Sequence, residues 1–283
     1  MAGILYVVAT PIGNLEDLTF RAKRILGEVG LIAAEDTRRT AKLLAHYAIR
    51  KPVISVREHN EAREAGRVIA RLEEGVDVAL VSDAGTPGIA DPGARLVRAV
   101  LNHELRVMPI PGPSAITAAL SVSGMDASQF VFMGFPPRKG TDRETWFIDL
   151  AAESRTVVFF EAPHRIERTL AQVESIKRPI VVIKEISKIN ELLVKSHNCY
   201  ILNSIVPLGE FAVVVAGNTA AVHPSSPASN TARLAMELYD LLTVDHGIPQ
   251  ALATELVAYR HGIPPNRVRV IIKKFKILVK QQT

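Results

Sequence analysis

The chain has 283 residues, which is enough for one large domain or two modest ones. Hydrophobic residues make up 48% of it and aromatic residues only 5%, so we expect a sizeable core of mostly aliphatic side chains. The single cysteine, Cys199, excludes an intrachain disulfide framework and fits a reducing compartment. Nothing in the sequence has the pattern of a signal peptide or a membrane span, so we expect a cytoplasmic protein with no membrane partner.

The net charge of +5 is unevenly distributed. Seven basic residues and no acidic ones lie between Arg260 and Lys280, which leaves a charge of about −2 for the rest of the chain. A local basic patch indicates a polyanionic partner, although a solvated helix face has the same pattern. The charge pattern by itself leaves both interpretations open.

The first half of the chain alternates short apolar runs with helical patterns. The predicted strands span residues 4–9, 31–34, 53–56, 76–82 and 105–110, and the predicted helices span residues 19–29, 37–47, 60–74 and 93–102. This β-α-β-α order is typical of an α/β fold with a mostly parallel sheet covered by helices on both faces. Ligands bind such sheets at the carboxyl ends of the strands.

The pattern changes in the second half of the chain. Strands are predicted at residues 130–134, 157–161, 180–184 and 211–217, a hinge loop at 136–140, and either a hairpin or two irregular strands within 188–208. A Ser- and Pro-rich stretch then precedes helical patterns at residues 232–242, 249–260 and 265–280. We therefore predict two α/β domains, residues 1–122 and 123–220, a linker at 221–231 and a basic helical module at 232–283.

Three loops rich in Gly and Pro follow predicted strands, at residues 9–14, 81–93 and 109–115. The middle loop contains three glycines, two prolines and the aspartates Asp83 and Asp91. Glycine lets the backbone approach a ligand closely and proline stiffens a loop, so this loop is predicted to bind a ligand. The two aspartates could equally be turn or helix-capping residues. Ser114 of the third loop is not expected to be a hydrolase nucleophile, because the glycine pattern of a nucleophile elbow is absent.

Charged and polar side chains also gather where predicted strands meet loops. These are Glu35-Asp36-Thr37-Arg38, Arg57-Glu58-His59-Asn60-Glu61, Glu161-Ala162-Pro163-His164-Arg165 and Lys184-Glu185. Individually they could be helix caps or surface ion pairs. Collectively they put charged groups along one edge of a sheet, where α/β enzymes build their active sites.

The motifs in order resemble the tetrapyrrole-methylase family, and within it the 16S ribosomal RNA (cytidine-2′-O)-methyltransferases of the small subunit. The matching stretches are Ala9–Leu15, Ala34–Arg38, His59–Glu61, Ser82–Pro87, Asp91–Gly93, Pro111–Ala115 and Phe160–Arg165, within a match over roughly residues 3–217. Two stretches depart from the family pattern. Residues 184–188 read Lys-Glu-Ile-Ser-Lys in place of the usual Arg-Glu-Leu-Thr-Lys, and residues 196–208 do not match.

The resemblance implies a homodimer of two α/β domains that bind S-adenosylmethionine in the cleft between them. The substrate would be a cytidine ribose in ribosomal RNA, as free RNA or within the 30S particle. The residues expected to bind the donor include Pro11 of the first loop. The full set is Pro11, Asp83, Gly85, Thr86, Ile89, Ser114, Ala115, Phe160, Glu210 and Phe211.

Transfer of a methyl group to a ribose hydroxyl is helped by a general base and needs no metal. The sequence offers four candidates and does not distinguish them: Asp36, His59, Glu161 and Lys184. The expected substrate-binding residues are Glu35, Arg38, Asn60, Arg165, Lys273 and Lys274, and Arg57, Arg138 and Lys139 are further candidates for phosphate contacts.

Two other functions compete with this one. A methylase acting on a tetrapyrrole would use the same fold and donor, but it needs no basic C-terminal stretch. A non-enzymatic RNA-binding protein would have no use for the carboxylates at the strand ends.

Overall fold

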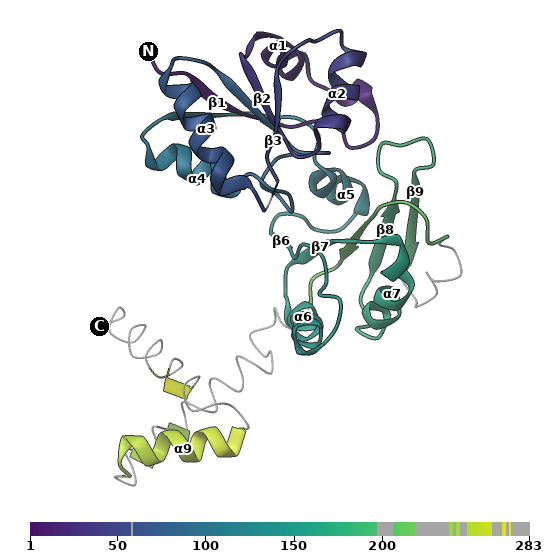
Figure 1. The fold of residues 1–283 in the computed structure, drawn as a ribbon. Helices are drawn as coiled ribbons and strands as arrows, with labels where there is room; N and C mark the ends of the chain where they lie inside the picture. Colours follow the sequence, from purple (N-terminus) through teal and green to yellow (C-terminus); the bar gives the residue numbers. More distant parts are fainter. Residues whose placement is uncertain are drawn as a thin grey trace. The chain divides into compact units, whose positions relative to one another are not determined.

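The computed structural model describes residues 1–57, 59–196 and 206–218, and in the C-terminal part residues 238–239, 242–243, 248–261, 268–269 and 272. The chain forms two compact units (Figure 1). Unit 1 comprises residues 1–150 and 155–216, and unit 2 comprises residues 151–154 and 217–283. The predicted linker at residues 221–231 lies outside the described residues.

The first sheet of unit 1 has five parallel strands in the order β3-β2-β4-β1-β5. The strands are β1 (Ile4–Val8), β2 (Leu31–Ala34), β3 (Val53–Ser55), β4 (Val78–Val81) and β5 (Arg106–Ile110). Leu5 of β1 lies opposite Val78 of β4 and Val107 of β5, so β1 is paired on both sides. The parallel sheet predicted for the first half is therefore confirmed.

Four helices cover the two faces of this sheet, as predicted. One face packs against α1 (Phe20–Glu28) and α2 (Thr37–His46), and the other packs against α3 (Glu61–Glu73) and α4 (Ala94–Asn102). Helix α1 begins where the Thr19 hydroxyl accepts a hydrogen bond from the Ala22 amide, 3.1 Å away. The apolar stripes of the four helices bury one aliphatic core on each face of the sheet.

The second sheet of unit 1 has the order β6-β7-β10-β8-β9, and only its β6–β7 pair is parallel. Its strands are β6 (Phe130–Phe132), β7 (Thr156–Glu161), β8 (Ile180–Lys184), β9 (Leu192–Ser196) and β10 (Phe211–Val215). Helices α6 (Thr141–Ala152) and α7 (Ile166–Glu174) cover one face. The stretch whose structure the sequence left open, residues 188–208, contributes the edge strand β9.

Helix α5 (Ala115–Ser123) follows the first sheet in the chain and packs on the second sheet. Its Ile116, Ala119 and Leu120 are buried against strands β7, β8 and β10. The helix runs up to the predicted domain boundary at residue 122, yet its packing partners lie beyond that boundary. The start of α5 is therefore placed where loops of both sheets can reach it.

Unit 2 has a small core of its own. Helix α9 (Gln250–His261) buries Ala253, Val257 and Ala258 against Tyr239, Val268 and Ile272. The helix predicted at residues 249–260 is thus confirmed, while most of the patterns at 232–242 and 265–280 lie outside the described residues. Among the described residues, no helix has the length and apolar character needed to cross a membrane.

Candidate methyl-donor pocket

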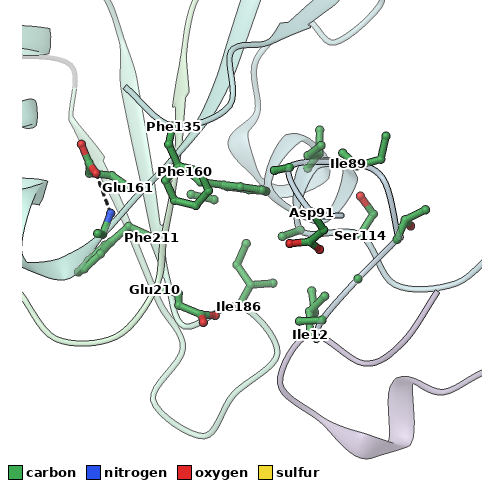
Figure 2. Close-up of a pocket in the computed structure, with 18 of the residues that line it drawn as sticks. Ile12, Ile89, Asp91, Ser114, Phe135, Phe160, Glu161, Ile186, Glu210 and Phe211 are labelled. Carbon is green, nitrogen blue, oxygen red and sulfur yellow. Dashed lines mark hydrogen bonds between the residues drawn. The ribbon is translucent and has the colours of Figure 1, made fainter. Parts of the chain in front are cut away.

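Unit 1 contains a cavity of about 320 Å³ lined by residues from both sheets (Figure 2). The first sheet contributes the loops that follow β1 and β4 and the segment between β5 and α5. The second sheet contributes the end of β7, Ile186 after β8 and the start of β10. The volume is that of a pocket for a small organic ligand.

The loops after β1 and β4 are hydrogen-bonded to each other at the edge of this cavity. The Thr10 amide donates to the Gly85 carbonyl at 2.9 Å, and the Gly85 amide donates to the Thr10 carbonyl at 3.0 Å. Gly85 has φ +77°, a conformation that a residue with a side chain adopts only under strain. Gly85 is one of the residues that line the cavity.

The walls of the cavity are largely apolar and aromatic. The Phe160 ring is in edge-to-face contact with Phe132, at 4.9 Å between ring centroids, and with Phe135, at 5.7 Å. Ile12 and Ile186 close the opposite end (Figure 2). Ile89 and Phe135 are about half exposed, at 47% and 50%, so they line the cavity while remaining open to solvent.

The carboxylate of Asp91 points into the cavity from the β4 loop (Figure 2). Burial raises the pKa of Asp91 to about 6, and repulsion from Glu35 and, more weakly, Asp83 and Glu210 adds to the shift. A hydrogen bond with Ser82 opposes it only in part. A bound cation would relieve this crowding of negative charge.

Asp91 lies in the loop predicted to bind a ligand, but it was not among the predicted site residues. The available signal was its position in the Asp91-Pro92-Gly93 motif. This motif is held by buried Glu61, whose carboxylate accepts hydrogen bonds from the amides of Gly93, at 3.1 Å, and Leu96, at 2.8 Å. Glu61 therefore caps α4 and fixes the loop that carries Asp91.

Eight of the ten residues predicted to bind the donor line the cavity: Gly85, Thr86, Ile89, Ser114, Ala115, Phe160, Glu210 and Phe211. Pro11 and Asp83 are not among the lining residues. The Asp83 carboxylate instead accepts from the Asp36 amide at 3.0 Å and lies 3.4 Å from the Arg39 guanidinium. Asp83 thus joins the ends of β2 and β4 beside the pocket.

Asp36 and Glu35 lie at the carboxyl end of β2, as predicted. The Asp36 carboxylate caps α2 and binds the exposed Arg38 side chain, and these hydrogen bonds hold the pKa of Asp36 far below its usual range. Glu35 accepts from the Asp83 amide at 3.3 Å, and burial raises the pKa of Glu35. The Asp36 carboxylate and the Arg38 guanidinium are therefore each other's ion-pair partners.

Glu161 borders the cavity, but its carboxylate points away from it (Figure 2). That buried carboxylate accepts hydrogen bonds from the Ala162 amide at 2.7 Å and the Thr169 hydroxyl at 2.6 Å. It also forms an ion pair with Arg165 at 2.6 Å. The second Arg165 nitrogen donates to the Pro136 carbonyl at 3.0 Å. Two predicted site residues thus meet in a buried ion pair behind the pocket wall.

The other predicted site residues are not among those that line the pocket, or they lie outside the described residues. Lys184 ends β8 and lies in register with the cavity residue Phe211. His59 is exposed just before α3. The Asn60 amide group accepts from the Arg57 amide at 2.6 Å and donates to the Ser55 carbonyl at 3.0 Å. Lys273 and Lys274 lie outside the described residues.

Comparison with known proteins identifies the family. The family model described as tetrapyrrole (corrin/porphyrin) methylases matches residues 4–197. The chain belongs to this family. A ribosomal RNA small subunit methyltransferase I from Pseudomonas aeruginosa is 42% identical over 272 residues, covering 93% of this chain and 95% of the relative. The protein of the same name from Synechocystis is 42% identical over 269 residues, covering 93% and 94%.

Solved structures show the same fold at low sequence identity. A diphthine synthase covers 76% of this chain and 90% of its own length, with a TM-score of 0.59 and 16% identity. A uroporphyrin-III C-methyltransferase from Thermus thermophilus covers 75% and 94%, with a TM-score of 0.51 and 19% identity. The predicted family and fold are confirmed, and the chain is a methyltransferase that draws on a methyl donor.

Proposed function

We propose that this chain transfers a methyl group from S-adenosylmethionine to the 2′-oxygen of a cytidine ribose in small-subunit ribosomal RNA. The observation that carries the proposal is the 42% identity, over 93% of the chain, to proteins named ribosomal RNA small subunit methyltransferase I. The cytidine and the ribose oxygen rest on the motif resemblance. A tetrapyrrole acceptor is not favoured, because these relatives are named for ribosomal RNA.

The cavity suits S-adenosylmethionine in shape and charge. Phe160 and the neighbouring isoleucines offer apolar walls to a heterocycle. Asp91 offers a carboxylate whose repulsion by the neighbouring carboxylates a bound cation would offset. When bound, the donor supplies an activated methyl group, whose bond to the sulfonium sulfur breaks as a bond to the acceptor oxygen forms. The sulfur keeps the electron pair, and the hydroxyl proton leaves to a base or to water.

The residues of the chain divide into those that face the cavity and those that hold its walls. Asp91 would bind the donor cation, and Glu161 would position the wall through Arg165. Asp36, His59, Glu161 and Lys184 were candidates for the base. Because Asp36 and Glu161 already have arginine partners, the proposal favours His59 and Lys184.

Three further properties belong to the proposal. The basic residues from Arg260 onward, including Lys273 and Lys274, would bind RNA phosphates of free RNA or of the 30S particle. The chain would act as a cytoplasmic homodimer. Exposed apolar side chains in and beside the edge strand β9, namely Ile189, Leu192 and Leu193, favour such an association, which measurement of the mass in solution would test.

Two experiments test the proposal. Transfer of labelled methyl groups to 30S particles or 16S RNA, followed by nuclease mapping, tests the acceptor. Labelling of a tetrapyrrole in place of RNA would refute it. Calorimetry of donor binding at about pH 6 tests the donor site, because buffers of different ionisation enthalpy reveal the number of protons released on binding. Binding of S-adenosylmethionine, whose sulfonium is a cation, should release a proton from Asp91. Binding of its demethylated product, whose thioether sulfur is neutral, should release fewer protons.

A further inference from the structure

A short loop carries an exposed aromatic ring to the pocket and is held rigidly from behind. It runs from Gly134, with φ +62°, to Gly140, with φ +80°, between β6 and α6. Its Phe135 is half exposed, lines the cavity and contacts Phe160 edge to face. Arg138 and Lys139 follow, and both side chains are exposed. The exposed phenyl ring beside the cavity offers a flat apolar face on which a planar group of a ligand can stack.

Two buried or nearly buried arginines bind the backbone of this loop. Arg165 donates to the Pro136 carbonyl at 3.0 Å, and Arg143 donates to the Pro137 carbonyl at 2.9 Å. Arg143 also binds Gln172 at 2.6 Å and the Thr169 hydroxyl at 3.0 Å. Burial lowers the pKa of Arg143, which reflects the cost of keeping this cation inside. The loop is therefore fixed in place before any ligand arrives.

The same network reaches the pocket wall. Glu161, which ends β7 beside the cavity, accepts from Thr169 and pairs with Arg165. The position of Phe135 relative to the donor pocket is thus set by hydrogen bonds among three buried side chains, Glu161, Arg143 and Thr169. A rigid ring beside a methyl donor suits a planar group of the acceptor, because rigid elements lose little entropy on binding.

We propose that the Gly134–Gly140 loop is the acceptor-binding element, with Phe135 stacking on a nucleobase of single-stranded RNA and Arg138 and Lys139 binding the adjacent phosphates. This inference rests on the proposed function. Stacking on an aromatic ring beside cations is the general mode of single-strand binding. A second hollow of about 800 Å³ adjoins the donor pocket, but Asp17 and Glu191 line it and would repel phosphates. The acceptor therefore approaches over Phe135.

The test compares Phe135→Leu, which keeps an apolar wall, with Phe135→Trp, which keeps a stacking ring. For the Leu variant we expect the KM for 16S RNA or 30S particles to rise about 5- to 150-fold, the range given by base stacking. The Kd for S-adenosylmethionine should rise much less, and Trp should restore the KM. An unchanged KM, or equal losses in KM and donor Kd, would overturn the proposal.

The cations are tested separately by the salt dependence of binding to a single-stranded, cytidine-containing oligonucleotide, which requires no turnover. Arg138→Ala with Lys139→Ala should reduce the slope of log K against log salt by about 1.4, which corresponds to two phosphate contacts. The matched control, Arg24→Ala with Arg71→Ala, removes two exposed cations, one on α1 and one on α3. An unchanged slope in the loop variant refutes the assignment. Failure of the unaltered enzyme to methylate ribosomal RNA refutes the proposed function instead.

Discussion

Replacing Asp91 by Asn should stabilise the protein near neutral pH. The folded-state pKa of Asp91 is about 6, against an ordinary value of 3.8, a difference of about two units. Each unit corresponds to about 1.4 kcal/mol, so the ceiling is about 3 kcal/mol. Because Asp91 remains partly exposed, solvent screening reduces the expected gain to about 1 kcal/mol.

The sign follows from proton binding. A carboxyl group whose pKa is raised on folding holds its proton more tightly in the folded state, so its ionisation destabilises the fold above about pH 6. Below the unfolded value of 3.8 both states are protonated and the penalty vanishes. The Asn variant should therefore be more stable than the unaltered protein at about pH 8 and equal to it at about pH 3.

Urea unfolding of both proteins across this pH range measures the difference directly. A matched control, Glu28→Gln, changes an exposed carboxylate of α1 and should show no such trend. The variant should at the same time bind S-adenosylmethionine more weakly, because the carboxylate proposed to bind the cation is gone. An Asn variant that is less stable at about pH 8, or whose advantage is independent of pH, would refute the electrostatic reasoning.

Gly85→Val should weaken donor binding at least tenfold, about 1.4 kcal/mol. Gly88→Val is the control, because it strains the same loop at φ +81° but lies outside the cavity lining. Equal losses of donor affinity in the two variants, measured by calorimetry, would contradict the site. Glu161→Ala leaves Arg165 without its buried partner and should lower the melting temperature by roughly 10 °C, while Glu28→Ala should not; equal melting would show that the ion pair is dispensable. His59→Ala should reduce kcat about 100-fold with little change in donor Kd, and unchanged turnover would remove it from the candidates for the base. Charge reversal in the C-terminal stretch should reduce the salt slope of RNA binding by about 2 to 3, and an unchanged slope would make the stretch a solvated face; the substitutions are Lys273→Glu, Lys274→Glu and Lys276→Glu.

Most elements of the first sheet could be predicted from the sequence because their signals are local. A buried parallel strand is a short run of aliphatic residues, and runs such as Val78–Val81 end within one or two residues of the prediction. The loops that follow these strands were recognisable from Gly and Pro, which act through the backbone of the residue itself. The resemblance to the family, and not the loop pattern, indicated the lining residues Phe160, Glu210 and Phe211.

Other features depended on contacts between residues far apart in the chain. The sequence could not indicate that α5 packs on the second sheet, because an apolar helix face does not specify its partner. The sequence did not indicate that strand β9 pairs with β8 either. Pairing of strands is set by the whole sheet and by its covering helices.

The sequence by itself determined the family, the fold class and the loops that form the pocket, because these are carried by local patterns and by motif order. The tertiary structure decided what each polar side chain does. It turned Glu161 toward Arg165 and Thr169, away from the cavity, and it brought the Asp83 carboxylate to the Asp36 amide and the Arg39 guanidinium. It also raised the pKa of Asp91 by surrounding it with other carboxylates and excluding water. Charge interactions depend on distance and burial in space, which residue order along the chain does not specify.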